Sequence, residues 1–321
     1  MKKYGSTEQF RSIIREVKTK HDYQGKDENG EAIFQHLTNY PILDFRGTVK
    51  LHGTNASIVK YKDGSINYQS RERVLSLEQD NAGFMMAMMN KDLDFLFNNI
   101  MFSDYCAIYG EWCGGNIQKG VALNGLEKMF VVFAIKADDE WIDLWSDLQD
   151  NEQGIYNILQ FKTFDVKIDF NNPELVQNKL IEDTLTVEEE CPVGKYFGVS
   201  GVGEGIVYSC VSDSSLKFKS KGEKHSVSKV KVLNSIDVEE LNSIKEFVEA
   251  VVTDNRLQQG MDYLKEMNIE VSPKNTGEFL GWVVRDVLKE ETDTIVANQL
   301  DMKKLKGAIV TKARIHYLNS I

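Results

Sequence analysis

Residues 48–57 read "TVKLHGTNAS" and place Lys50 at the end of an apolar, strand-like run. A polar turn follows at once and contains His52, Gly53 and Asn55. A strand end holds a side chain rigidly, and a glycine lets another group approach the backbone closely. Lys50 is therefore a candidate nucleophile, although an isolated lysine is more often a solvated surface residue.

The length and composition are those of a globular protein with more than one domain. The chain has 321 residues, of which 42% are hydrophobic and 27% charged. The first twenty residues lack the apolar core of a signal peptide, and no stretch approaches the ~20 apolar residues of a membrane span. We expect a cytoplasmic monomer with no membrane partner.

Charge and cysteine usage narrow the possible partners. The net charge of −11 argues mildly against nucleic acid. The tract 216–231, however, concentrates six lysines and His225, so a local basic groove on an acidic body remains open. The four cysteines show neither metal-ligand nor disulfide spacing, which favours reduced, structural thiols.

The order of predicted elements indicates an α+β fold with antiparallel sheets. An amphipathic helix is predicted over 6–17, capped by Ser6. Residues 56–71 predict a β-hairpin with its turn at Asp63-Gly64, and 84–100 predict a helix. Irregularly spaced strands are expected at 106–112, 129–136, 140–145, 204–211 and 215–220.

The last ~85 residues have a helical pattern. Asp237 and Glu240 form a possible capping box, and four apolar stripes follow, over 241–251, 257–264, 279–288 and 305–318. We therefore predict a large α+β domain, 1–234, and a small all-α domain, 235–321.

A nucleophilic lysine needs neighbours that lower its pKa from about 10.4. Lys217 and Lys219 are two residues apart on a predicted strand, so they share a face and would supply cations beside Lys50 or bind phosphate. The alternative for "KFKSK" is a solvated edge strand. Glu111 and Glu204 lie at strand ends and are candidate ligands for a ribose hydroxyl or a metal.

Six short motifs of the sequence resemble those of a known enzyme family. "KLHG" (50–53) matches the KxxG motif of covalent nucleotidyltransferases, and "SRER" (70–73), "YGEW" (109–112), "MFVVF" (129–133), "EGIV" (204–207) and "LKFKSK" (216–221) follow in the family's order. The set resembles ATP-dependent RNA ligases of the phage RNA ligase 2 type. His52 and Asn55 are typical of that branch. DNA ligases and capping guanylyltransferases, in contrast, usually show K-x-D-G-x-R.

The resemblance implies a role for each matched position. Lys50 would attack the α-phosphorus of ATP and hold AMP, and Arg71, or alternatively Arg73, would contact the ribose or the acceptor phosphate. Glu111 would hold the ribose and Phe133 would stack on the adenine. Glu204 would touch the nucleotide or position a metal, Mg²⁺ or Mn²⁺, and Lys217 and Lys219 would grip the α-phosphate. His52 and Asn55 belong to the same nucleotide-binding set.

Two positions depart from the family's pattern. Ala134 stands where an aspartate often follows the stacking aromatic, and Tyr208, Ser209 and Cys210 stand where a lysine often follows EGxV. Lys221 or Lys224 are possible substitutes for that lysine.

The resemblance implies an ATP-dependent RNA ligase that joins 3′-hydroxyl and 5′-phosphate RNA ends, a nicked duplex among the candidates, through lysyl-AMP and an AMP-capped RNA. An RNA-repair role would follow. The lysine-rich tracts after Lys217 and at 303–316 are candidates for RNA contact, the latter alternatively a solvated helix face. Two other readings stay open: another enzyme of the superfamily, or a catalytically silent protein that binds RNA ends.

Overall fold

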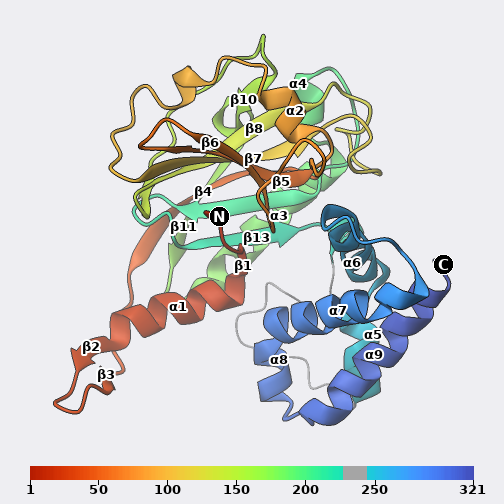
Figure 1. Ribbon diagram of the computed structural model, residues 1–321. Helices are drawn as coiled ribbons and strands as arrows, with labels where there is room; N and C mark the ends of the chain where they lie inside the picture. Colours follow the sequence, from red (N-terminus) through yellow and green to blue (C-terminus); the bar gives the residue numbers. More distant parts are fainter. Residues whose placement is uncertain (227–243) are drawn as a thin grey trace. The chain divides into compact units, whose positions relative to one another are not determined.

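The computed structural model describes residues 1–226 and 244–321, which form two compact units (Figure 1). The first unit contains Met1–Glu8 and Ser12–Lys224, and the second contains Gln9–Arg11 and His225–Ile321. The predicted boundary at 234/235 lies outside the described residues, as do Lys229, Lys231 and the capping box at 237–240. That boundary stays a prediction.

The sheet that carries Lys50 has five strands. Its order is β1 (Glu8–Gln9), β13 (Lys217–Lys221), β12 (Gly205–Cys210), β4 (Ile42–Lys50) and β11 (Thr163–Asp169). β4 pairs antiparallel with both β11 and β12, and β12 pairs antiparallel with β13. The central position of β4 therefore places Lys50 at the end of a strand that is held on both sides.

A second, six-stranded sheet carries Glu111 and Phe133. Its order is β10 (Ile155–Asn157), β8 (Met129–Ala137), β7 (Tyr105–Cys113), β5 (Thr54–Tyr61) and β6 (Ile66–Ser70), with β9 (Glu140–Ile142) paired to β8. The β5–β6 hairpin turns at Gly64, whose φ of 85° confirms the predicted turn. The sheet is antiparallel as predicted, except that β10 pairs parallel with β8.

The two faces of this second sheet differ in what covers them. One face builds an apolar core from Ile58, Ile108 and Val132, covered by short helical pieces, α2 (Phe84–Met88) and η1 (Asp94–Leu96). The longer helix expected over 84–100 does not form. The opposite face carries Tyr105, Tyr109 and the half-buried Phe133.

The first helix begins later than the sequence pattern predicts. α1 spans Phe10–Asp22, because the Ser6 hydroxyl donates to Glu8 Oε1 at 2.6 Å instead of capping a helix. The remaining elements of residues 1–226 had no sequence prediction: β2 (Tyr23–Lys26), β3 (Ala32–Phe34), η2 (Ile158–Gln160), η3 (Pro173–Val176), α3 (Gln177–Glu189), α4 (Pro192–Tyr196) and η4 (Glu223–His225). Of these, α3 supports the Lys50 sheet, since Tyr208 on β12 donates to Asp183 Oδ2 at 3.3 Å.

The second unit is helical, as predicted. Its elements are α5 (Ile244–Val251), α6 (Asp254–Glu266), η5 (Pro273–Asn275), α7 (Thr276–Glu290), α8 (Thr292–Ala297) and α9 (Met302–Leu318). The apolar stripes supply its core, which includes Phe247, Leu264, Val283 and Ile309. No helix in the described ranges has the length and hydropathy needed to cross a bilayer.

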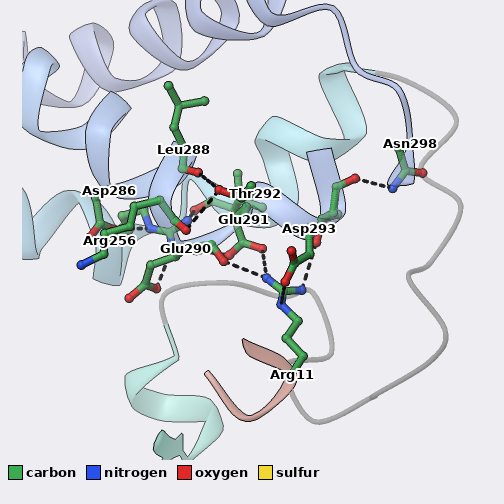
Figure 2. Close-up of polar contacts among 12 residues, drawn as sticks. Arg11, Arg256, Asp286, Leu288, Glu290, Glu291, Thr292, Asp293 and Asn298 are labelled. Atoms are coloured by element: carbon green, nitrogen blue, oxygen red, sulfur yellow. Dashed lines mark hydrogen bonds and ion pairs between the residues drawn. The ribbon is translucent and has the colours of Figure 1, made fainter. Parts of the chain in front are cut away.

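A buried charge network organises the second unit (Figure 2). The fully buried Arg256 on α6 pairs with Asp286 at 2.9 Å and Glu290 at 3.1 Å, and its Nη1 donates to the Val251 carbonyl at 2.6 Å. Glu291 accepts from Arg256 at 3.5 Å and from Arg11 at 3.0 Å, so one carboxylate links the two guanidinium groups. Buried charges are tolerated when they are paired in this way.

Candidate active site

Three neighbouring strands bring Lys50, Glu204 and Lys221 together. Gly205 on β12 lies opposite Lys50 on one side and opposite Lys221 on the other. The preceding residue, Glu204, receives Lys50 Nζ at 2.8 Å on Oε2 and Lys221 Nζ at 2.8 Å on Oε1. One carboxylate therefore bridges two ammonium groups.

The Glu204 carboxylate is buried and ionised. Its side chain is 2% exposed, and His52 Nδ1 lies 3.1 Å from Oε2. Burial alone would raise the pKa of Glu204, but the charges of Lys221 and Lys50 outweigh it and hold that pKa well below its usual range. The site thus has a fixed negative charge surrounded by cations.

The environment of Lys50 lowers its pKa. Burial disfavours the ammonium form, Glu204 opposes this effect, and Lys221 adds to it, so that the net pKa lies below the ordinary lysine value. The side chain is still 24% exposed. Lys50 therefore combines an increased neutral fraction with access for a substrate, as a nucleophile requires.

Glu111 lies beside this cluster on β7. Its Oε1 accepts the Gly53 backbone N–H at 3.0 Å, and Asn55 on β5 lies directly opposite it in the sheet. Burial raises the pKa of Glu111 to about 7, even though Lys50 acts in the other direction. Asn55 and Glu111 thus share one face next to Lys50.

Close packing explains the glycine of the KxxG motif. A Cβ at Gly53 would lie 2.4 Å from the Trp112 carbonyl oxygen and 2.7 Å from Cys113 Cβ. The turn after Lys50 is therefore pressed against the end of β7, which is a reason for glycine besides the approach of a substrate.

Phe133 stands at an irregularity of the second sheet. Tyr109 pairs with Ala134 and Gly110 with Val132, which leaves Phe133 as the extra residue of a β-bulge. Its ring meets Tyr4 edge-on, with centroids 4.9 Å apart. A bulge re-aims a side chain, and here it presents a half-buried aromatic ring on the same sheet face as Glu111.

The two candidate arginines differ in what they contact. Arg71 is exposed, and its positive charge opposes, in small part, the effect of burial that raises the pKa of Glu111. Arg73 donates to the backbone carbonyls of Gln79 and Asp80, so it stabilises its own loop. The geometry favours Arg71 over Arg73 as the site residue.

The structure does not place Lys217 beside Lys50. Lys217 Nζ lies over the rings of Tyr4 and Trp141, at 3.8 and 3.9 Å from their centroids. Lys219 lies between Lys217 and Lys221 on the same strand face. Among the lysines of β13, Lys221 is the one that contacts the Glu204 carboxylate, two residues beyond the predicted pair of Lys217 and Lys219.

The sequence motifs assign no role to Tyr4 or Trp141. They make Lys221 only a possible substitute for the lysine that often follows EGxV. The period-two pattern cannot distinguish which lysines of this strand contact phosphate, because it contains three of them at every second position, Lys217, Lys219 and Lys221. Tyr4 and Trp141 have no local signal, because only the folded sheets bring them to Lys217.

The predicted metal role of Glu204 gains no support from the geometry. Both of its oxygens contact cationic or imidazole side chains. No group of three or more metal-ligating side chains forms within residues 1–226 and 244–321. We therefore assign no step to a metal on Glu204.

The arrangement suits attack on a phosphoanhydride. Displacement at phosphorus needs a positioned nucleophile and cations that neutralise developing charge. Lys50 supplies the first. Lys219 and Lys221 lie on β13 of the same sheet, with β12 between them and Lys50, and can supply the second.

Known structures give weak matches, and curated sequences give none. A mutant Naegleria gruberi RNA ligase in its apo form aligns with a TM-score of 0.46 and 21% identity, over 70% of this chain and 57% of that one. Two other mutants of that ligase, one with AMP and Mn and one with ATP and Mn, give TM-scores of 0.46 and 0.45 at 18% identity. Both cover 70% of this chain and 56% of theirs.

The sequence itself matches a protein family. The model of the family described as RNA ligase matches residues 44–231, more than half of the chain. That range contains Lys50, Glu111, Glu204 and Lys221, which form the cluster described above. The chain belongs to the RNA ligase family.

Proposed function

We propose that this protein is an ATP-dependent RNA ligase of the phage RNA ligase 2 type, acting in RNA repair. It joins a 3′-hydroxyl to a 5′-phosphate through lysyl-AMP on Lys50. The observation that supports this most is the bridged cluster of Lys50, Glu204 and Lys221, in which a lysine with a lowered pKa lies beside a second cation.

The first step consumes ATP. The neutral Lys50 Nζ attacks the α-phosphorus, a phosphoramidate bond forms, and the bond to the bridging oxygen breaks as pyrophosphate leaves with its electron pair. The amine proton leaves to solvent or phosphate, because the strongly acidic Glu204 is a poor base. Lys219 and Lys221 stabilise the α-phosphate during the displacement.

The next two steps involve RNA. A 5′-phosphate oxygen attacks the phosphorus of lysyl-AMP, which frees Lys50 and produces a 5′-5′ pyrophosphate cap of AMP on the RNA. The 3′-hydroxyl then attacks the RNA phosphorus, loses its proton, and displaces AMP. Glu111 and Asn55 hold the ribose, and Phe133 contacts the adenine.

A divalent metal would accompany ATP. Mg²⁺ in nucleotide sites is usually held by substrate phosphates and water with only one or two carboxylates, and Mn²⁺ has the same preference for oxygen ligands. Its chemistry here would be neutralisation of phosphate charge. The residues of this chain need only position the nucleotide and the nucleophile.

α9 is our candidate for RNA contact. Its 17 residues contain no acidic side chain, and its exposed cations Lys303, Lys304, Lys306 and Arg314 form no ion pair within the described ranges. Gly307 lies among them, and a Cβ there would meet nothing within 4 Å. A glycine inside a helix costs about 1 kcal/mol relative to alanine, and packing against the described residues does not require this one. A close approach by a phosphate backbone accounts for both features.

Sealing assays test the function. Purified protein with ATP and Mg²⁺ should join 3′-hydroxyl and 5′-phosphate RNA ends, and Lys50→Ala should abolish joining from ATP while still sealing RNA already capped with AMP. Single-stranded and nicked duplex substrates, each with an RNA or a DNA 3′-hydroxyl end, identify the preferred polynucleotide. Binding of RNA ends without any joining would instead identify a silent end-binding protein.

Charge removal on α9 tests the RNA surface. The triple variant Lys303→Ala, Lys304→Ala, Arg314→Ala should weaken RNA binding, and the slope of log affinity against log salt should fall by roughly 0.7–0.9 per lost phosphate contact. Lysyl-AMP formation should not change. The matched control is Lys195→Ala, which removes an exposed lysine that already pairs with Glu190. An unaltered salt slope in the triple variant would place the RNA elsewhere.

A further inference from the structure

Lys217 lies far from the attacking lysine along the sheet. In the strand register Lys221, Gly205 and Lys50 form one row, whereas Lys217 lies in the row of Ser209 and Arg46. The two rows are four residues apart, which corresponds to about 13 Å along a strand. Lys217 therefore belongs to the opposite end of the site from the phosphate that Lys50 attacks.

The ammonium of Lys217 is buried between aromatic rings. The residue is 6% exposed, and its Nζ lies 3.8 Å from the Tyr4 centroid and 3.9 Å from the Trp141 centroid. It has neither an ion pair nor a hydrogen bond to any described residue, and burial together with Lys136 lowers its pKa to about 8. Its three hydrogen-bond donors are therefore available to a ligand.

The N-terminal segment holds Tyr4 at this place. The Lys2 backbone N–H donates to Gln69 Oε1 at 3.0 Å, and Lys2 Nζ lies 3.6 Å from the Tyr105 centroid. The Tyr4 ring then contacts the rings of Tyr109, Phe133 and Trp141, at centroid distances of 5.4, 4.9 and 5.6 Å. These contacts make residues 2–4 part of the site rather than a loose tail.

Residues of the second sheet also lead from the Lys50 end of the site to the Lys217 end. Glu111, which lies near Lys50, is followed on the same face by Tyr109 with Phe133, and then by Lys136 with Trp141. Lys217 of the first sheet contacts Trp141 of the second. Both sheets thus lead from the phosphate end at Lys50 to an aromatic end at Lys217, the order of phosphate, ribose and base in a nucleotide.

We propose that Tyr4, Trp141 and Lys217 form the base-recognition end of the nucleotide site, where the Lys217 ammonium donates a hydrogen bond to a ring nitrogen of the purine. The aromatic rings offset the burial of the cation and shield this hydrogen bond from water. Lys217 is thereby a specificity residue for the base and not a phosphate ligand. This inference rests on the proposed use of ATP.

Two ligands that each contain only part of ATP can probe the two ends of the site independently. Adenosine has the base without phosphates, and tripolyphosphate has phosphates without the base. Calorimetric titration of the full-length protein should show that Lys217→Met and Tyr4→Ala each weaken adenosine binding about tenfold, the value of one charge-assisted hydrogen bond or cation–π contact, and leave tripolyphosphate binding unchanged. The matched variant Lys221→Met should show the reverse pattern. Lys217→Met keeps the length of the buried stem, so it should fold.

The two probes distinguish a base-binding role of Lys217 from a phosphate-binding role. If Lys217→Met weakens tripolyphosphate and spares adenosine, Lys217 is a phosphate ligand and the inference is wrong. Unchanged binding of both probes, or no adenosine binding by the wild type, also overturns it. The proposed ligase function fails in a different way, since a wild type that binds adenosine but never forms lysyl-AMP would retain the base pocket without the reaction.

Discussion

Glu204 is the residue on which the charges of the site converge. Its two oxygens hold Lys50 and Lys221, and His52 lies against one of them. Lys221 has a double effect, since it can contact phosphate and it also lowers the pKa of Lys50. Substitution of Lys221 therefore tests the geometry of the cluster more sharply than substitution of a peripheral lysine.

Lys221→Met should slow lysyl-AMP formation by about 100-fold, the usual loss when one preorganised donor is removed. The pH profile of the rate should also shift to higher pH, because loss of the neighbouring cation raises the pKa of Lys50. Rapid-quench measurement of AMP transfer from pH 6 to 10 would follow both effects. The control is the exposed Lys62→Met. A normal rate and profile for Lys221→Met would show that the Lys221–Glu204 pair is dispensable.

Glu111 should make stability depend on pH. Its pKa in the folded protein is about 7, whereas glutamate in an unfolded chain titrates near ~4.3. The folded state binds this proton more tightly, so the stability contribution is fully present below the unfolded pKa and is lost as pH rises through 7. Glu111→Gln should raise the free energy of unfolding by up to about 3 kcal/mol at pH 8 and by almost nothing at pH 4. Urea unfolding at both pH values measures this, and an equal effect at both would contradict it.

At the scale of elements, β12 determines how the lysines meet. Gly205 has a φ of 150°, and a Cβ there would lie 2.1 Å from the Ser220 carbonyl oxygen and 2.9 Å from Lys221 Cα. Gly205→Ala should therefore displace β13, destabilise the protein by about 2–4 kcal/mol, and reduce lysyl-AMP formation in the protein that remains folded. Thermal unfolding and labelling of one preparation would test both. A variant with unchanged stability and activity would exclude the tight β12–β13 packing.

α9 offers the opposite kind of test. Gly307→Ala should stabilise the second unit by up to about 1 kcal/mol, since a helix interior favours alanine and a Cβ meets no neighbour there. The same methyl group should weaken RNA binding if a phosphate backbone approaches α9 closely. Gly277→Ala in α7, where a Cβ is equally free of contacts, is the control. Unfolding curves and RNA titrations would reveal stabilisation without loss of binding, which would remove Gly307 from the proposed surface.

The elements also show how far sequence reasoning reaches. Period-two runs predicted β7, β8, β12 and β13, and the apolar stripes predicted α6, α7 and α9, because these patterns are local. The motif order predicted Lys50, Glu111 and Glu204. The choice among Lys217, Lys219 and Lys221 depends on the register against β12, and Tyr4 depends on how the N-terminal segment crosses the second sheet. Register and non-local packing leave no periodic trace in the sequence.

The whole molecule contains two units, each with its own core. In the second unit Arg256→Met would leave the carboxylates of Glu290 and Glu291 buried without Arg256, which typically costs about 3–5 kcal/mol. Hydrogen exchange should therefore accelerate in α5–α9 and remain unchanged in β7 and β8. The control is Arg285→Met, which removes an exposed arginine from α7. Accelerated exchange in both units of Arg256→Met would mean that they unfold as one.

The covalent role of Lys50 can be measured by transfer of labelled AMP to the protein. Protein is first cleared of bound AMP with pyrophosphate, then incubated with α-labelled ATP or GTP and magnesium, denatured, and scored for label retained on the chain. We expect stable label from ATP on the wild type, little from GTP, and none on Lys50→Ala. Absence of label on the cleared wild type, or label that persists in Lys50→Ala, would contradict it.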